Sequence, residues 1–290
     1  MKVDLRALAM GLAFVIMWSS AYATARIIVA DAPPLTALAL RFVISGLIAV
    51  GIARAMGQTW RLTRAQWRAT AIFGLCQNGV YLGLNFVALQ WIEASLASII
   101  ASTMPLLVAL LGWLFFGTKV RLLGLAGLAA GVLGVALIMG ARIETGVNLT
   151  GVAMCGVAAF ALALATLSVK GASSGGNLLM IVGLQMLVGA AALGAAALAL
   201  ESWQVNWTLS LGLAFAYQIV VPGLVATILW FNLVQRVGAV RASTFHFLNP
   251  FFGVAAAALL LGERVRPLDL IGVGIVMAGI LMVQLSRQPG

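Results

Sequence analysis

Residues 84–138 read LNFVALQWIEASLASIIASTMPLLVALLGWLFFGTKVRLLGLAGLAAGVLGVALI, and residues 229–283 read LWFNLVQRVGAVRASTFHFLNPFFGVAAAALLLGERVRPLDLIGVGIVMAGILMV. The two stretches align without a gap at a constant spacing of 145 residues. The aligned pairs include Phe86 with Phe231, Gln90 with Gln235, Pro105 with Pro250, Gly117 with Gly262, and Gly134 with Gly279. The chain therefore contains an internal duplication.

The composition places this duplication in a membrane. Of 290 residues, 63% are hydrophobic and 8% are charged, and the mean hydropathy is +1.12. A soluble domain has too little interior to cover so many apolar side chains. Nearly all of the sequence falls into apolar segments of about 20 residues, the length at which a helix crosses a bilayer. We expect an all-α polytopic membrane protein with ten transmembrane helices. They are predicted at 7–29, 35–54, 69–90, 94–116, 121–141, 150–170, 177–200, 209–235, 239–261 and 267–286.

The charges predict the orientation of these helices. When alternate loops are assigned to opposite sides, the side of the N-terminus receives most of the Lys and Arg residues, and Asp4 is its only acid. Basic loops stay in the cytoplasm, so both termini are predicted to be cytoplasmic. The net charge of +10 is therefore a topology signal that favours anionic membrane lipid, and it does not indicate nucleic acid.

The number of helices predicts how the two halves are related. Five spans in each half place residues 146–290 in the membrane upside down relative to residues 1–145. Glu93 is predicted on the outer side, whereas the corresponding basic region, from Arg236 to Arg241, is predicted on the inner side. Two inverted five-helix repeats around a central cavity are typical of transporters that open alternately to either side. A duplication retained only for stability is the alternative.

Small residues predict where helices approach each other closely. Gly127 and Gly134 lie in the fifth span, and Gly272 and Gly279 lie in the tenth. Small residues at such spacing let helix backbones touch in lipid. We expect the two spans to pack, with a dimer seam as the alternative, in a monomer or a weak homodimer.

Prolines interrupt the fourth and ninth spans at corresponding positions, Pro105 and Pro250. A proline inside a helix removes one backbone hydrogen bond and frees a carbonyl that must face protein, water or ligand. We expect each proline to form a hinge beside the cavity; a static kink is the alternative.

Polar and aromatic side chains predict the substrate site. The third span carries Asn78, Tyr81 and Asn85 on one helical face, and the first span carries Trp18 and Tyr22. The fourth span adds Ser102, and the ninth adds His246 and Asn249. Together they indicate an aromatic, amide-rich cavity at mid-membrane, although hydrogen bonds between helices would explain about half of these residues.

Acidic residues are missing from the centres of the spans, where proton-driven carriers often hold a carboxylate. His246 is the only group near mid-span that titrates near neutrality. We therefore expect a neutral cavity for neutral, zwitterionic or aromatic small molecules. Arg41 is expected near the outer surface, where it extends to the interface or pairs with an acid such as Asp31.

These features resemble the EamA-type exporters of the drug/metabolite transporter superfamily, over essentially the whole chain. The resemblance rests on Pro33-Pro34 followed by Leu40-Arg41-Phe42, and on a proline in spans 4 and 9 followed by Gly117-Thr118 and Gly262-Glu263. Thr118 departs from the usual glutamate. Within the superfamily the chain is most similar to bacterial inner-membrane amino-acid exporters of the YddG type.

That resemblance implies alternating-access export of amino acids, including aromatic ones, through a cavity between the halves. By position it places Asn78, Ser102, Met104, Pro105 and Phe160 at the cavity. Some relatives have bulky aromatic residues just before the proline of span 4, where this chain has Ser102 and Met104. This difference argues against strict aromatic selectivity.

Three other functions compete with this prediction. A multidrug or nucleotide-sugar carrier would share the fold, but nucleotide sugars would require basic residues at mid-membrane. An enzyme would require a catalytic set, and one histidine with no central carboxylate does not supply it. We therefore expect no enzyme activity, no cofactor and no metal. A membrane scaffold or receptor remains open and would have no ligand cavity between the repeats.

Overall fold

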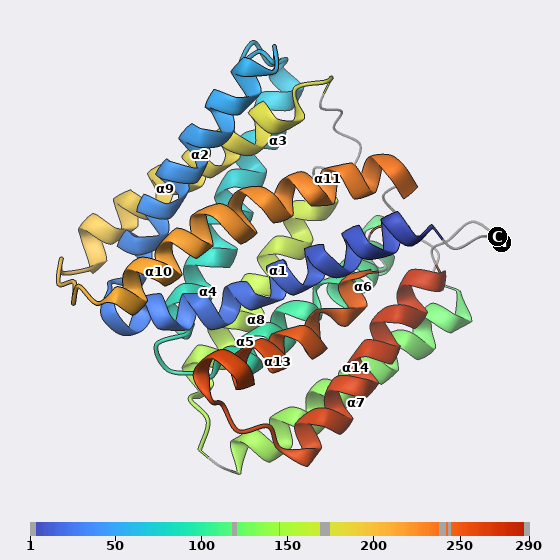
Figure 1. Cartoon of the computed structure of the whole chain (residues 1–290). Helices are drawn as coiled ribbons and strands as arrows, with labels where there is room; N and C mark the ends of the chain where they lie inside the picture. Colours follow the sequence, from blue (N-terminus) through green and yellow to red (C-terminus); the bar gives the residue numbers. More distant parts are fainter. Residues whose placement is uncertain are drawn as a thin grey trace.

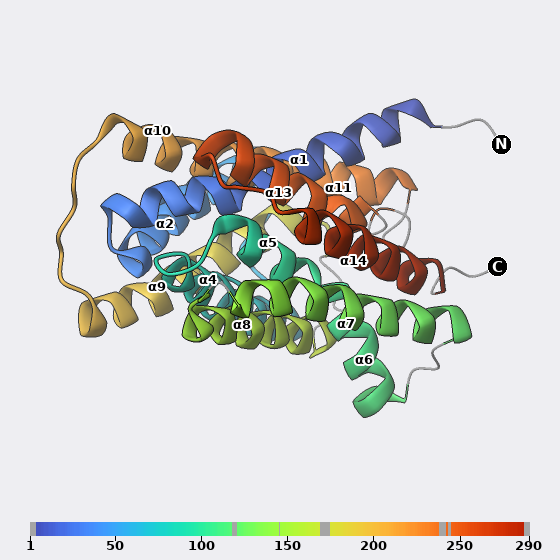
Figure 2. The same ribbon diagram turned by 90° about the horizontal axis from the view of Figure 1, so that it is seen from below.

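The computed structural model describes residues 4–117, 121–144, 146–168, 175–237, 242 and 245–286, and these residues form helices without any strand (Figure 1). In chain order the elements are α1 (Leu5–Asp31), α2 (Pro34–Ala55), α3 (Arg64–Phe73), η1 (Gly74–Tyr81), α4 (Leu82–Ala88), α5 (Ala94–Ser102), α6 (Met104–Phe116), α7 (Leu122–Ile143), α8 (Leu149–Ser168), α9 (Leu178–Leu200), α10 (Leu209–Gln218), η2 (Ile219–Val225), α11 (Ala226–Val237), η3 (Phe245–Leu248), α13 (Asn249–Leu261) and α14 (Pro267–Ser286). The beginning of α1 and the end of α14 lie on the same side of the molecule (Figure 2).

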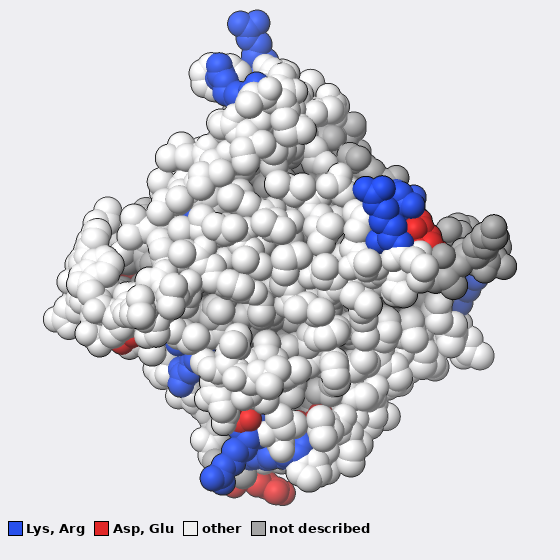
Figure 3. Space-filling model, in the orientation of Figure 1, with Lys and Arg blue, Asp and Glu red and all other residues white. Residues whose placement is uncertain are grey.

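The helices have the length and surface of membrane spans. Within the described residues, eight helical segments are long and apolar enough to cross a bilayer. The spans expected at 150–170 and 239–261 correspond to shorter apolar helices, Leu149–Leu164 and Phe245–Leu261, and residues 239–241, 243 and 244 lie outside the described part. Charged side chains gather at the edges of the face in Figure 3, around a broad uncharged centre. Large apolar side chains such as Leu122 and Leu259 are more than 80% exposed. This surface suits lipid, so the chain is a multi-pass membrane protein.

Two helices contain a π-helical segment in which the backbone is wound more widely. The segments η1 and η2 begin at Gly74 and Ile219, which have the same 145-residue spacing as the sequence repeat. Pro222 lies inside η2, where it cannot donate a backbone hydrogen bond. Such segments are frequent at functional sites.

The two aligned prolines lie where helices are interrupted. The helix α5 ends at Ser102, and α6 begins at Met104 with Pro105 in its first turn. In the second half, α13 has Pro250 in its first turn and follows the short 3₁₀ helix η3. Proline is tolerated in a first turn because the missing N–H would have no partner inside the helix there. Both spans are therefore discontinuous.

The glycines of α7 and α14 pack against each other within one chain. A Cβ atom on Gly127 would lie 2.7 Å from the carbonyl oxygen of Gly279, and one on Gly134 would lie 2.9 Å from that of Gly272. The early glycine of α7 thus meets the late glycine of α14, so the two helices run antiparallel (Figure 1). Contact this close requires residues without side chains.

The helices α2 and α9 form a second antiparallel pair. Gly46 and Gly183 face each other, and a Cβ on either one would lie 3.0 or 3.1 Å from the other's carbonyl oxygen. Ala53, near the end of α2, belongs to the same buried cluster as Leu179, near the start of α9. The first helix of each half packs on the other half in the corresponding way. The helix α1 packs on α13, α10 and α11, and α8 packs on α5, α6, η1 and α4.

Candidate functional site

A cavity lies between α1, α2, α4, the end of η1, the end of α10 and η2. Its volume is about 40 Å³, which holds a few water molecules. Residues from both halves of the chain line it, namely Trp18, Ala21, Tyr22, Ala25, Arg41, Tyr81, Leu82, Asn85, Phe86, Leu89, Gln218 and Pro222. Four of the predicted substrate residues (Trp18, Tyr22, Tyr81 and Asn85) are among them.

The aromatic part of the cavity comes from two helical faces. Trp18, Tyr22 and Ala25 lie on one face of α1 because they are separated by four and three residues. Tyr81 ends η1, so the π-helical segment delivers its ring to the same space. The hydroxyl oxygens of Tyr22 and Tyr81 are 2.5 Å apart and share a hydrogen bond. This bond joins α1 to η1 across the cavity wall.

Two amide side chains present an unpaired oxygen. Asn85 donates from Nδ2 to the carbonyl of Tyr81 at 2.7 Å, and its Oδ1 has no hydrogen-bond partner among the described residues. Gln218 donates from Nε2 to the carbonyl of Ala21 at 2.6 Å and to Thr24 Oγ1 at 2.8 Å; its Oε1 likewise has no partner there. A carbonyl can only accept, so the nitrogen of each amide must face it. Two acceptor oxygens are therefore left over.

Arg41 lines the same cavity, and this corrects a prediction. The prediction that Arg41 reaches the interface or pairs with Asp31 is wrong, because Arg41 is only 6% exposed. Asp31 instead accepts hydrogen bonds from Asn206 at 3.0 Å and Thr208 at 2.7 Å. The expectation of a cavity without charge is wrong for the same reason. An ionisable residue inside an apolar span indicates a functional position. The prediction missed this indication because it placed Arg41 near the outer surface.

His246 and Asn249 lie next to the cavity, in an aromatic cluster. The His246 ring is 4.9 Å from Trp230 and 5.4 Å from Phe14 between centroids. Asn249 Nδ2 donates to His246 Nδ1 at 3.0 Å. Phe14 is one turn from Trp18, at 5.7 Å between rings, so this cluster adjoins the end of the cavity nearer the start of α1. Neither His246 nor Asn249 lines the cavity itself.

The other predicted residues lie in packing positions. Asn78 is buried against α9, where a Cβ on Gly189 would lie 2.3 Å from its own Cβ. Ser102 donates to the carbonyl of Ser98 at 2.6 Å within α5. Met104 packs against the cluster that contains Tyr81. Phe160 is 43% exposed on α8. The structure therefore does not bring these four side chains to the cavity lining.

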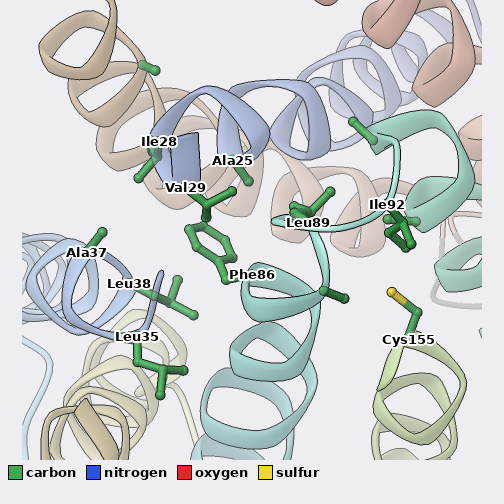
Figure 4. Close-up of a cluster of buried hydrophobic side chains, with 14 of the residues drawn as sticks. Ala25, Ile28, Val29, Leu35, Ala37, Leu38, Phe86, Leu89, Ile92 and Cys155 are labelled. Carbon is green, nitrogen blue, oxygen red and sulfur yellow. The ribbon is translucent and has the colours of Figure 1, made fainter. Parts of the chain in front are cut away.

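An apolar layer lies between the cavity and the opposite side of the molecule. Figure 4 shows Ala25 and Val29 of α1 close to Phe86 of α4 and to Leu89, which directly follows α4. All four are buried in one cluster with Leu38. Beyond this layer lies a surface hollow of about 1020 Å³, whose lining includes Asp31, Gln90, Glu201 and Asn206. The cavity is thus flanked by this apolar layer on one side and by the aromatic cluster around His246 on the other.

Metal ligands are not clustered in the part of the chain that the structure describes. There, no three His, Cys, Asp or Glu side chains gather as metal ligands do. What the cavity offers is binding, through one cation, two acceptor oxygens and aromatic rings.

Comparison with known proteins identifies relatives over nearly the whole length. The model of the EamA-like transporter family matches twice, at residues 5–140 and 149–285. The uncharacterized transporter YvbV of Bacillus subtilis (strain 168) is 27% identical and covers 93% of this chain and 88% of its own. The uncharacterized inner membrane transporter YedA of Escherichia coli (strain K12) is 26% identical, over 95% of this chain and 89% of its own. A solved crystal structure superposes with a TM-score of 0.68 at 20% identity and covers 98% of both chains, which supports the fold alone.

Proposed function

Because the chain belongs to the EamA-like transporter family, we propose that this membrane transporter exports small zwitterionic or neutral metabolites by alternating access. Amino acids, including aromatic ones, are the proposed substrates. The observation that carries the proposal is the central cavity, which is lined from both halves by aromatic rings, amide oxygens and one guanidinium. A concave site with a few convergent polar groups is typical of small-molecule recognition.

Alternating access requires two halves that can exchange roles. We propose two inverted repeats, residues 1–145 and 146–290, with ten membrane crossings. The antiparallel packing of α2 on α9 and of α7 on α14 supports this arrangement, because each pair joins helices at corresponding positions of the two halves. Inverted repeats of this kind place the substrate site at their interface.

The layers on either side of the cavity are the proposed gates. A volume of about 40 Å³ does not admit an amino acid, so binding requires one layer to open. The interrupted helices at Pro105 and Pro250 and the π-helical segments offer places where the backbone can bend. The apolar layer at Phe86 would open to one side of the membrane and the aromatic cluster at His246 to the other.

The orientation follows from charge. Arg54, Arg61, Arg64 and Arg68 lie at or near the connection between α2 and α3, and Arg236 lies at the end of α11, all predicted on the side of the chain termini. Basic loops stay in the cytoplasm. We propose that the protein lies in a bacterial inner membrane with both termini cytoplasmic, and that it works as a monomer or a weak homodimer.

Reconstitution tests the proposal. Proteoliposomes would be assayed for uptake of a radiolabelled amino-acid panel with and without a pH gradient. We expect saturable uptake by the wild type. Tyr81→Ala should abolish it, because Tyr81 lines the cavity, whereas Tyr217→Ala should retain most of it, because Tyr217 does not.

Two results would contradict the proposal. Absence of uptake for every amino acid would remove this substrate class, and drug efflux in the same vesicles would then favour a multidrug carrier. Equal rates in both tyrosine variants would move the site away from the cavity.

A further inference from the structure

Arg41 is a buried cation without an anion. The chain has seven Asp and Glu side chains, all within the described residues, and none of them forms a hydrogen bond or ion pair with Arg41 there. Asp4 binds Arg236; Asp31 binds Asn206 and Thr208; Glu93 and Asp269 bind Arg142; Glu201 binds the start of α2; Glu263 binds the start of α5; and Glu144 lies exposed at the end of α7. The Nε atom of Arg41 is buried and has no hydrogen-bond partner within that part of the chain. Its guanidinium carbon lies 5.1 Å from the centre of the neighbouring Phe42 ring.

The burial of Arg41 carries a cost for the fold. Removing a charge from water is costly unless hydrogen bonds and a counter-charge compensate for it. Arg26, on α1, shows the usual solution, because its Nη1 donates to the carbonyl of Leu89. Arg41 lacks such a partner and faces the cavity instead. Costly features of this kind concentrate at functional sites.

We propose that Arg41 binds the carboxylate of the transported molecule, and that the free amide oxygens of Asn85 and Gln218 accept hydrogen bonds from its ammonium group. This inference rests on the proposed function and names the recognised group. A guanidinium pairs with a carboxylate through two parallel hydrogen bonds. Amide oxygens and the faces of Trp18 and Tyr22 suit an ammonium group. The cavity thus offers partners for both the carboxylate and the ammonium group of an amino acid.

The same chemistry predicts discrimination. A solute without a carboxylate leaves Arg41 buried and unpaired, so the site should reject it strongly. Three probes separate the two charges: L-phenylalanine carries both, L-phenylalanine amide lacks the carboxylate, and 3-phenylpropanoate lacks the ammonium. Their rings are identical, so differences in binding report on the charged groups.

The experiment measures ligand-induced thermal stabilisation of the purified protein in detergent, with the three probes, for the wild type, Arg41→Lys and Arg41→Gln. For the wild type we expect L-phenylalanine to bind at least about tenfold tighter than its amide. Arg41→Lys should keep a weaker preference because it retains the charge, and Arg41→Gln should lose the preference. Without ligand, Arg41→Gln should unfold at the same temperature as the wild type or higher, since it removes an unpaired buried charge.

The outcomes separate this inference from the transport proposal. If Arg41→Gln discriminates the probes as the wild type does, or if the wild type does not discriminate them, the Arg41 site is overturned. A ligand-free Arg41→Gln that unfolds well below the wild type also overturns it, because Arg41 would then be structural. Carboxylate-dependent binding without uptake into vesicles would support the site and contradict the transport proposal. If Arg41→Gln leaves amino-acid uptake unchanged, the transport proposal is supported and the Arg41 site is contradicted.

Discussion

Two arginines are buried within the described residues, and their surroundings are opposite. Arg142, at the end of α7, is 4% exposed and lies between the carboxylates of Glu93 and Asp269. Its Nη2 is 2.8 Å from Asp269 Oδ2, and its Nε is 3.3 Å from Oδ1, which makes a two-bond pair. Arg41 is 6% exposed and has no such partner.

The difference separates a structural charge from a binding charge. Arg142 joins α7, α14 and the residue that precedes α5, so its interactions stabilise the side of the molecule opposite the chain termini. Arg41 has no carboxylate partner among the described residues and lines the cavity. Burial alone does not distinguish the two arginines. The positions of the carboxylates do: Arg142 is paired with them, whereas Arg41 is the arginine proposed to bind a ligand.

The largest expected effect comes from removing the partner of Arg142. Asp269→Asn should lower the free energy of unfolding by about 3 kcal/mol, because breaking one side of a buried ion pair leaves an uncompensated charge. Denaturant unfolding in detergent micelles would measure this loss. Glu93→Gln is the matched control and should cost less, since the Glu93 side chain is 43% exposed. A loss that is equal for both variants, or absent, would show that Arg142 is not held by Asp269.

The next effect tests whether Arg41 can be given a carboxylate like that of Arg142. Asn85→Asp places an acid of the same shape in the cavity that Arg41 lines. The new carboxylate should neutralise Arg41 and attract ammonium groups. We expect the preference to shift by about tenfold, or 1.4 kcal/mol, from L-phenylalanine towards its amide in competition assays.

The control for this substitution is Asn85→Leu, which removes the amide oxygen without adding charge. It should weaken the binding of both amine-bearing probes and leave 3-phenylpropanoate nearly unaffected. An Asn85→Asp variant that keeps the wild-type order of affinities would mean that Arg41 does not sense this side of the cavity.

A smaller effect concerns the neutral part of the cavity. Tyr22→Phe and Tyr81→Phe each remove one hydroxyl of the 2.5 Å pair, and each should destabilise the protein by about 1 kcal/mol. The double variant should cost less than the sum of the two, because the bond is lost only once. Thermal unfolding of the four proteins gives this coupling energy.

Asn78→Ala provides the transport control for these tyrosine variants. Asn78 was predicted at the site, but it packs on α9. Uptake by Asn78→Ala should therefore exceed uptake by Tyr81→Ala. A complete loss of uptake in a folded Asn78→Ala protein would return Asn78 to the site.

The smallest effect comes from an exposed ion pair. Hydrogen bonds from Arg236, and next from the backbone N–H of Ala7, lower the pKa of Asp4 below its ordinary value of 3.8. A lowered pKa in the folded state adds stability above the ordinary pKa and loses it as the pH falls through the folded pKa. Asp4→Asn should therefore differ slightly from the wild type at pH 7 and not at pH 2. Exposed pairs contribute little, so a thermal shift comparable to that of Asp269→Asn would contradict the distinction between buried and surface charges.

Helix positions were the most predictable part of the fold, because they follow from apolar length and proline placement. Pro105 and Pro250 indicated interrupted spans, and both lie at helix interruptions. The glycines of the fifth and tenth spans indicated close packing, and Gly127 and Gly279 do meet. Helical periodicity predicted the cavity face of α1 less completely, since it shows which residues share a face but not what that face meets.

The candidate site was harder to predict for the same reason. Asn78 and Asn85 are seven residues apart, yet the π-helical segment between them changes the facing of the helix, so that Asn85 lines the cavity and Asn78 packs on α9. Gln218 is one of several polar residues in its span, and only the packing of the helices shows that it lines the cavity. Arg41 was assigned to the surface because snorkelling is the usual fate of an arginine near a helix end.

The sequence by itself determined the membrane setting, the helical class, the duplication and the family, because these depend on composition, span length and spacing along the chain. The tertiary structure alone decided which polar groups find partners. Partnering depends on distances between helices far apart in sequence, such as the 2.5 Å between the hydroxyls of Tyr22 and Tyr81. For this reason Arg142 is satisfied by Asp269, 127 residues away, while Arg41, in an equally apolar helix, is left facing the cavity.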